Sequence, residues 1–171
     1  MDQHTEMEQS FLKLYDEFAG PIFRHCYFRV SLRETAEDLT QESFMRVWNY
    51  LAKGKTVENP KAFLYHVAGN LIIDYYRKKK ETSLDMLAEE GFNPTGDDAS
   101  LIINNAEGQH TLSFIAKLEP IYREVLTMRY VDNLSLSEIA EIVGESENVV
   151  SVRIHRGIEK LKKLFHYEKS N

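Results

Sequence analysis

The segment 134–165 constrains the fold of this chain more than any other, because two helical patterns flank one glycine in it. The apolar residues of its first half share one helical face: Leu136, Ile139, Ala140 and Val143. Ser135 and Glu138 have the spacing of a capping box, which marks the start of this helix. Gly144 follows, and glycine adopts the left-handed conformation that ends a helix at low steric cost. The pattern predicts a short helix that stops at a defined turn.

A second helix is predicted after this turn, with Ser146 as its N-terminal cap. Its apolar residues again share a face: Val150, Ile154, Ile158, Leu161 and Phe165. Two short helices joined by a tight turn form a helix-turn-helix, whose second helix can enter the major groove of DNA. The exposed face carries cations that suit phosphates and base edges: Arg153, His155, Arg156, Lys160, Lys162 and Lys163. An ordinary helical hairpin with a solvated basic face is the alternative.

The chain as a whole is acidic, with a formal net charge of −6 over 171 residues. A free-standing DNA-binding domain is usually basic, so either the cations are concentrated locally or another molecule supplies part of the affinity. Cys26 is the single cysteine, which excludes an internal disulfide framework or zinc cluster. No secretory signal and no bilayer-length apolar run is present, and we expect a soluble intracellular protein without membrane insertion.

Signs of catalysis are missing from the sequence. It contains no phosphate-cradling glycine loop, no paired ligand histidines and no nucleophile–base pair. We therefore expect no enzyme activity, no cofactor, no metal and no small-molecule substrate.

The N-terminal part begins with apolar residues at helical spacing from Phe11 to Val30, interrupted at Gly20-Pro21. Because proline cannot continue the backbone ladder, we expect either a kinked helix or two consecutive helices. Four residues on one face are expected in the core: Phe11, Leu14, Tyr15 and Phe18.

Ser31 and Glu34 have the spacing of a second capping box, before a helix predicted over 36–51. The apolar side of that helix carries Phe44, Val47, Trp48 and Leu51. The other side carries polar residues at spacings of three and four: Asp38, Gln41 and Glu42. Such a face is most often simply solvated, but it can also dock a partner that presents basic residues.

Residues 53–59 are predicted to form a loop, and Asn59-Pro60 starts a helix well, with a capping residue and a proline at the first helical position. The buried stripe of this helix is predicted to be Leu64, Val67, Ala68, Leu71 and Tyr75. Its exposed line carries His66, Asn70 and Arg77, with Tyr65 and Tyr76 adjacent and the cations 77–80 at its end. Aromatic and basic residues together suit single-stranded nucleic acid. The alternative is that the tyrosines are core and the cations complement the helix dipole.

The stretch 82–110 differs in composition, since it has acidic residues and chain breakers but no lysine or arginine. Such a composition is typical of a flexible linker. It separates a predicted N-terminal domain, 1–81, from a C-terminal domain, 111–171, in which Pro120 begins another helix. The expected fold class is all-α, with two small helical domains joined by an acidic linker.

Three stretches together resemble a known family: AEDLTQESFMRVW at 36–48, NPKAFLYHVAGNLIIDYYRKKK at 59–80, and the segment 122–164 from YREVLTMRY to EKLKKL. In this order, with a variable linker between the second and third, they resemble the bacterial RNA polymerase sigma factors of the extracytoplasmic-function (ECF) group. The resemblance implies a cytoplasmic bacterial protein that binds core RNA polymerase and promoter DNA. It also implies an anti-sigma factor as a further partner.

The resemblance assigns roles to residues of this chain. Polymerase docking falls to Asp38, Gln41 and Glu42. Reading and opening of the minus-ten promoter element falls to the loop 53–59 and the helix after it, through Lys53, Asn59, His66, Asn70, Asp74, Arg77 and Lys78. Reading of the minus-thirty-five element falls to the helix-turn-helix, through Asn148, Ser151, Val152, Arg153, His155 and Arg156.

The sequence departs from the family pattern at a few positions. Phe63 stands where many members carry tryptophan, and Ser151 and Val152 stand where many carry a basic residue followed by Ser or Thr. The base preference of other members therefore does not transfer to this chain.

Two other functions compete with this one. A stand-alone dimeric helix-turn-helix regulator would bind a two-fold repeat with half-sites about one helical turn apart. A helical adaptor would use Asp38, Gln41 and Glu42 to bind a protein and would not bind DNA.

Overall fold

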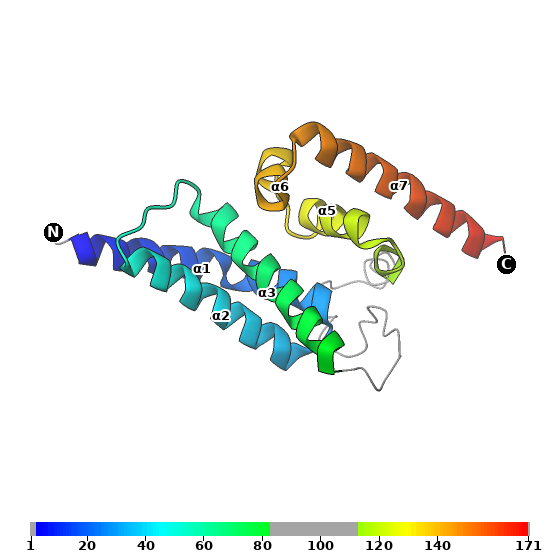
Figure 1. The fold of residues 1–171 in the computed structure, drawn as a ribbon. Coiled ribbons are helices and arrows are strands. Elements are labelled where there is room, and N and C mark those ends of the chain that lie inside the picture. The colour runs from blue at the N-terminus through cyan, green and yellow to red at the C-terminus, as the bar shows by residue number, and fades with distance from the viewer. Residues whose placement is uncertain (1–2, 83–112, 171) are drawn as a thin grey trace. The chain divides into compact units, whose positions relative to one another are not determined.

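The computed structural model describes residues 3–82 and 113–170, and the chain divides into two units, Met1–Ala88 and Glu89–Asn171. The described residues form helices and no strands (Figure 1): α1 Gln3–Val30, α2 Arg33–Ala52, α3 Pro60–Thr82, α5 Pro120–Tyr130, α6 Leu136–Val143 and α7 Glu147–Lys169. The predicted all-α class is confirmed. Apart from Thr82, which ends α3, the predicted linker 82–110 lies outside the described residues. None of the described helices is long and apolar enough to cross a lipid bilayer.

The first unit is a bundle in which α1, α2 and α3 each pack against the other two. Its core is assembled from all three helices and includes Ile22, Cys26, Phe28, Ala36, Phe44, Val47, Leu64, Ala68 and Leu71. A single helix, α1, continues through Pro21, so the alternative of two consecutive helices is wrong. Cys26 is fully buried, as expected for a small apolar residue.

The predicted core face of α1 is only partly buried. Leu14 is buried, but Phe11 and Phe18 are partly exposed and Tyr15 is 45% exposed. For Phe11 and Tyr15 the reason is tertiary, because α1 and α2 leave a groove between them beside these two rings instead of closing over them.

The start of α2 differs from the prediction of a capping box at Ser31 and Glu34. The N-cap is Leu32, and no side chain caps the helix. Ser31 has a φ of 58°, and its N–H donates to the carbonyl of Tyr27, so it closes α1 instead of opening α2. The two helices are joined so tightly that the residue expected as a cap is used to end the preceding helix.

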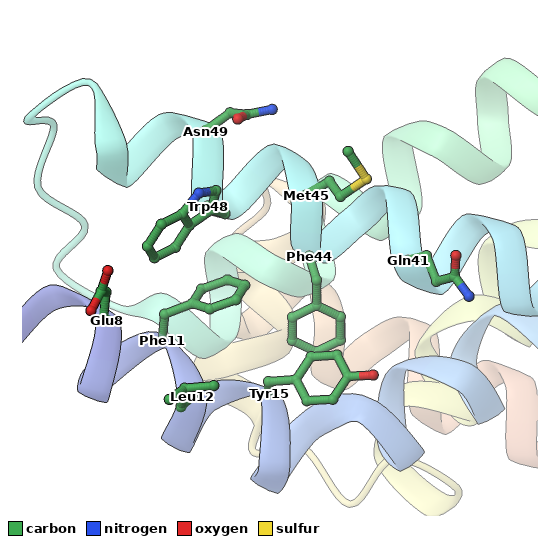
Figure 2. A pocket seen from close by; sticks show the side chains of 9 residues that line it. All are labelled: Glu8, Phe11, Leu12, Tyr15, Gln41, Phe44, Met45, Trp48 and Asn49. Atoms are coloured by element: carbon green, nitrogen blue, oxygen red, sulfur yellow. The ribbon is translucent and has the colours of Figure 1, made fainter.

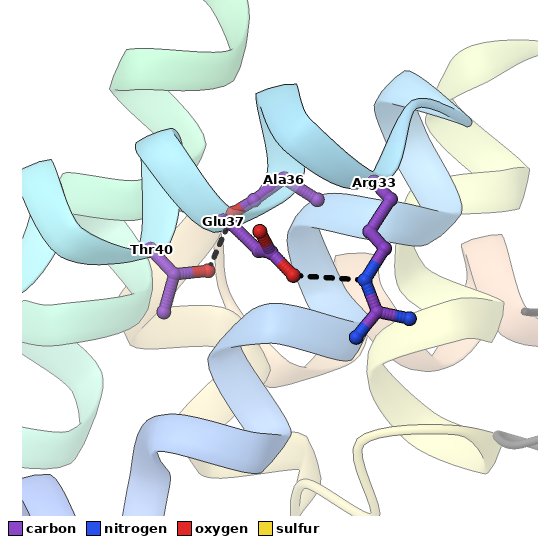
Figure 3. A network of polar contacts seen from close by, with 4 residues as sticks. All are labelled: Arg33, Ala36, Glu37 and Thr40. Atoms are coloured by element: carbon purple, nitrogen blue, oxygen red, sulfur yellow. Dashed lines mark hydrogen bonds and ion pairs between the residues drawn. The ribbon is translucent and has the colours of Figure 1, made fainter.

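The first turns of α2 are held by local polar contacts (Figure 3). Nε of Arg33 lies 2.9 Å from Oε1 of Glu37 on the exposed side. On the buried side the Thr40 hydroxyl donates to the carbonyl of Ala36 at 2.6 Å, which satisfies a polar group that would otherwise be costly to bury. Thr40 is thus compatible with the core. The pair of Arg33 and Glu37 belongs to the polar face that α2 keeps toward solvent.

The second unit confirms the helix-turn-helix. The Ser135 hydroxyl accepts from the N–H of Glu138, and the Glu138 carboxylate accepts from the N–H of Ser135, which completes the predicted capping box. Gly144 ends α6 with a φ of 70°. Ser146 caps α7 by accepting from the N–H of Val149 at 3.2 Å.

The core of the second unit joins α5, α6 and α7, with Pro120 at the start of α5 as predicted. Val150 and Ile154 are buried, whereas the later members of the predicted α7 stripe, Ile158, Leu161 and Phe165, are partly exposed. Gly157 was not predicted as a core residue, yet it is buried. A Cβ at that position would lie 2.9 Å from Cδ1 of Leu126, so glycine allows α7 to pack closely on α5.

Candidate functional site

The polar face of α2 consists of Asp38, Gln41 and Glu42. Asp38 and Gln41 are exposed and Glu42 is partly exposed, so the structure brings the three side chains to one accessible side of the helix. Oε1 of Glu42 lies 2.8 Å from Nε of Arg46, which offsets part of the negative charge. The face remains acidic and hydrogen-bonding, as a docking surface for a basic partner requires.

An apolar groove lies between α1 and α2 next to this polar face (Figure 2). It has a volume of about 580 Å³ and is lined by Glu8, Phe11, Leu12, Tyr15, Gln41, Phe44, Met45, Trp48 and Asn49. Its rings contact one another, with centroids 5.0 Å apart for Phe11 and Trp48 and 4.8 Å apart for Tyr15 and Phe44. Gln41 belongs to both the groove and the polar face, so the two surfaces are continuous.

Sequence reasoning missed this groove. Leu12 and Met45 are each 59% exposed and lie off the predicted core stripes. Large apolar residues outside a stripe are the available signal, but isolated exposed apolar residues are common on protein surfaces and the signal is weak.

The loop 53–59 forms as predicted, between α2 and α3. With the end of α2 and the start of α3 it borders a cleft of about 650 Å³ that also involves Met7, Ser10 and Leu14. Nζ of Lys55 lies 4.8 Å from the ring centroid of Tyr50, and that ring packs on Phe63 at 4.8 Å. Phe63, at the position where the sequence departs from the family pattern, is therefore part of an aromatic cluster under the loop.

Asn59 has a structural task in this loop. Its Oδ1 accepts from the N–H of Ala62 at 3.1 Å and so caps α3, as the sequence predicted. Lys53 is exposed at the end of α2. The two predicted DNA contacts of the loop thus lie at its two ends.

The exposed line of α3 carries His66, Asn70 and Arg77, as predicted. Asp74 lies on the same side, and its Oδ1 is 3.1 Å from Nη2 of Arg77. Lys78 is also exposed. Ile73 lies between these polar residues and is 64% exposed, so this side of α3 also presents an apolar side chain to solvent.

The two tyrosines predicted beside this line behave differently. Tyr65 is 1% exposed and its ring meets the His25 ring edge-on with centroids 4.9 Å apart, so for Tyr65 the alternative of a core residue is confirmed. Tyr76 is 45% exposed, but its hydroxyl donates to the backbone carbonyl of Arg29. The helical period placed Tyr65 next to the exposed line, whereas α1 covers that side of α3.

Five of the α7 residues predicted to read the minus-thirty-five element form an exposed surface of that helix: Asn148, Ser151, Val152, His155 and Arg156. Arg153 is different, because its side chain is only 26% exposed and its Nη2 lies 2.6 Å from Oε1 of Glu145. The structure therefore brings five of the predicted residues to the surface and turns the sixth toward a carboxylate.

Other cations of α7 are also close to carboxylates. Nε2 of His155 lies 3.5 Å from Oε1 of Glu159, and Nζ of Lys160 lies 3.2 Å from Oε1 of Glu119. Arg156 makes no ion pair with any described residue of the second unit. A phosphate or a guanine could therefore bind Arg156 without displacing a carboxylate of the described second unit.

A small notch lies beside this surface, between the first turn of α5 and α7. It has a volume of about 280 Å³ and is lined by Ile121, Tyr122, Asn148, Val149, Val152, Arg153 and Arg156. Ile121 is 50% exposed and Val152 is 41% exposed. Apolar atoms beside the predicted reader of the minus-thirty-five element suit the methyl group of thymine. Sequence reasoning missed Ile121, because it precedes the helix-turn-helix and its exposure depends on how α5 packs.

Comparisons with known proteins agree with this arrangement. The Sigma-70 region 2 family model matches residues 14–82, and the Sigma-70, region 4 model matches residues 111–161. The chain is 32% identical over 170 residues to the ECF RNA polymerase sigma factor SigW of Bacillus subtilis, covering 91% of this chain and 89% of that protein. It is 30% identical to the RNA polymerase sigma factor YlaC of the same organism, with 95% and 94% covered.

Solved structures show the same fold. The sigma factor RpoE of Bartonella quintana, crystallised with the anti-sigma factor NepR, aligns with a TM-score of 0.74 at 19% identity, over 92% of this chain and 98% of that one. CnrH, in complex with the cytosolic domain of CnrY, aligns with a TM-score of 0.67 at 21% identity, over 94% and 90%.

The two family models occur in the order of the two units, and the second match contains α6, the turn and the first part of α7. A stand-alone dimeric regulator or an adaptor would account for one match but not for both. The sequence identity to SigW extends over nearly the whole chain. The chain belongs to the ECF family of RNA polymerase sigma factors.

Proposed function

We propose that this sigma factor directs core RNA polymerase to a two-part promoter, with one part read by each of its units. The observation that carries the proposal is the pairing of the two matches, region 2 over residues 14–82 and region 4 over residues 111–161. As an initiation factor it is not itself an enzyme, and its place of action is the bacterial cytoplasm, where polymerase works. The domain boundaries proposed for this division are 1–81 and 111–171, with 82–110 as the linker.

Docking to polymerase is assigned to the polar face of α2. Asp38, Gln41 and Glu42 suit a basic surface on the polymerase clamp, and the exposure of all three supports this assignment. The adjoining apolar groove adds hydrophobic area that water would otherwise contact. Docking to polymerase also explains how a DNA-binding protein can have a net charge of −6, because the factor need not hold DNA alone.

The minus-ten element is assigned to the loop 53–59 and the exposed line of α3. The residues proposed to contact DNA there are Lys53, Asn59, His66, Asn70, Asp74, Arg77 and Lys78. Opening the duplex and flipping a base costs on the order of a few kcal/mol of stacking and pairing. Because Tyr65 is buried, it cannot stack on a flipped base. The contacts that offset the cost of opening the duplex are therefore assigned to the loop 53–59 and to the cations of α3, which would follow the DNA backbone.

The minus-thirty-five element is assigned to α7, through Asn148, Ser151, Val152, His155 and Arg156, whereas Arg153, the sixth residue that the resemblance names, is paired with Glu145. Gly144, which ends α6, and the Ser146 cap define where α7 begins, so the first three turns of α7 present these side chains from a fixed start. Five of the six are accessible for contact, and Arg156 is unpaired within the described second unit.

An anti-sigma factor is the further partner we propose. Of the proteins with the same fold, the sigma factor RpoE was solved in complex with the anti-sigma factor NepR, and CnrH was solved in complex with the cytosolic domain of CnrY. The apolar groove between α1 and α2 supports the proposal, since an exposed apolar patch of this kind marks a surface that binds a protein.

The test is run-off transcription with core polymerase and genomic fragments, with and without the protein. Defined transcripts that appear only when the protein is added are expected. A palindromic operator bound equally well without polymerase would instead establish the stand-alone regulator.

A further inference from the structure

The ion pair between Arg153 and Glu145 crosses the turn of the helix-turn-helix. Nη2 of Arg153 lies 2.6 Å from Oε1 of Glu145, a short distance typical of a charge-assisted hydrogen bond. The two residues are eight apart in sequence, whereas residues three or four apart are the neighbours on one helix. The contact is therefore made by the packing of the turn against α7.

Glu145 is fixed at its backbone before its side chain reaches Arg153. It follows Gly144, whose φ of 70° reverses the chain at the end of α6. The N–H of Glu145 donates to the carbonyl of Ala140 at 3.0 Å, a bond of the kind that closes a helix end. The carboxylate thus extends from an anchored position, which lowers the entropy lost on pairing.

The pair changes what each arginine of α7 can do. A phosphate that reaches Arg153 must displace the Glu145 carboxylate, and Glu145 itself repels a polyanion. Arg156, three residues further along, meets no such competitor among the described residues of the second unit. Two arginines that look equivalent in sequence are therefore unequal in the folded protein.

We propose that Glu145 is a positioning residue that withholds Arg153 from DNA, so that contact of α7 with the minus-thirty-five element rests on Arg156 and the uncharged side chains beside it. The inference rests on the proposed function of α7. Phosphate contacts raise affinity for every sequence alike, whereas base contacts discriminate. By withholding one cation, Glu145 limits non-specific binding and increases the share of affinity that depends on sequence.

The experiment compares Glu145→Gln with Glu147→Gln. Both variants lose one negative charge near the start of α7, but Glu147 is exposed and makes no ion pair with a described residue of the second unit. Glu147→Gln therefore controls for the general effect of charge. Binding of the full-length protein to a random-sequence duplex is measured by fluorescence anisotropy over a range of salt concentrations.

Glu145→Gln is expected to bind the random duplex about threefold more tightly at low salt than Glu147→Gln, as one added phosphate contact would give. The slope of log affinity against log salt should steepen by about 0.9. A merely structural role of Glu145 would not move this slope. Equal binding and equal slopes for the two variants would overturn the inference.

A double-mutant cycle with Arg153→Ala identifies the residue through which Glu145 acts. With Glu145 intact, Arg153→Ala should change the affinity for the random duplex less than twofold. When Arg153 is alanine, Glu145→Gln should no longer bind this duplex more tightly than Glu147→Gln does. A large loss from Arg153→Ala alone would show that Arg153 already contacts DNA and would refute the inference.

A holoenzyme arm separates this inference from the proposed function. Duplexes selected from a random pool by the wild-type holoenzyme are compared with versions whose upstream element is scrambled. Glu145→Gln should raise binding to both duplexes about threefold and leave the ratio of selected to scrambled binding unchanged, because a phosphate contact raises affinity for every sequence alike. If the wild-type holoenzyme does not distinguish the two duplexes, the proposed function of α7 fails, while the double-mutant cycle still decides the role of Glu145.

Discussion

The cations at the end of α3 and those of α7 are arranged in opposite ways. Residues 77–80 follow one another and are all exposed, so successive positive charges point in different directions around the helix. The cations of α7 are spaced along the helix, and Arg153, His155 and Lys160 each lie near a carboxylate. Arg77 also pairs with a carboxylate, that of Asp74, so the two groups of cations differ in their spacing. Consecutive cations around α3 can follow a flexible single strand from several directions, whereas the spaced cations of α7 suit one side of a duplex.

The glycines of the same two helices differ in a similar way. Gly69 in α3 has open space where a Cβ would be, whereas Gly157 in α7 is closed in by Leu126 and Tyr122. The first unit thus leaves α3 with room, while the second unit holds α7 tightly against α5. Precise positioning suits a helix that reads base edges in a groove, where the donor and acceptor pattern must be matched.

The largest effect is expected from changing the promoter rather than the protein. If the two units read separate elements, inserting a half-turn of DNA, about 5 base pairs, between the elements rotates one to the opposite face of the helix. Run-off transcription should be abolished. A full-turn insertion of about 10 base pairs returns the element to the same face of the duplex and should reduce transcription less. Full activity with the half-turn insertion would mean that one unit alone directs initiation.

The contrast between the glycines predicts stability changes of opposite sign. Gly157→Val should lower the free energy of unfolding of the second unit by about 1–3 kcal/mol, because its side chain overpacks the contact with Leu126. Gly69→Ala should raise the stability of the first unit by about 0.5–1 kcal/mol, because alanine favours a helix and meets no atom within 4 Å. Chemical denaturation followed by circular dichroism measures both. A destabilising Gly69→Ala would show that α3 is as tightly packed as α7.

Arg156→Ala tests whether the unpaired arginine of α7 reads a base. A guanine contact would cost roughly 1–3 kcal/mol of binding and relax the preference at one base pair, as measured with holoenzyme on single-base variants of the promoter. A phosphate contact would weaken all sequences alike and reduce the salt slope by about one. Lys162→Ala is the control on the same helix. If Arg156→Ala weakens DNA binding no more than Lys162→Ala does, Arg156 is a solvated surface residue.

Charge reversal on α2 tests the docking surface of the first unit. Asp38→Lys with Glu42→Lys should weaken binding to core polymerase, while stability changes by about 0.5 kcal/mol or less, as is usual for surface substitutions. Asp16→Lys with Glu17→Lys on α1 alters the net charge by the same amount at exposed positions. Co-purification with core polymerase should separate the two double variants, and equal retention would remove the docking assignment.

The smallest effect is expected from the linker. The composition of 82–110 predicts no packed core, so replacing part of it with Gly and Ser residues of equal length should leave much of the promoter-directed transcription. The polymerase would then hold the two units at the correct separation. Loss of transcription with both units still folded would show that the linker makes specific contacts of its own.

The sequence by itself determined the features that depend on neighbouring residues. The capping box of Ser135 and Glu138, the left-handed Gly144, the Ser146 cap and the start of α3 at Asn59-Pro60 all appear in the structure as predicted. Each is a contact over a few residues, whose geometry follows from residue type and spacing. The family assignment rests on the same kind of information, because whole motifs occur in a fixed order.

Only the tertiary structure decided which predicted faces are covered. Tyr65 is buried because α1 packs over that side of α3, and Tyr15 is exposed because α1 and α2 leave a groove there. The pairing of Arg153 with Glu145 depends on the angle between the turn and α7, which the helical period does not contain. A periodic pattern states which residues share a face, whereas the packing of helices from distant parts of the chain determines what that face meets.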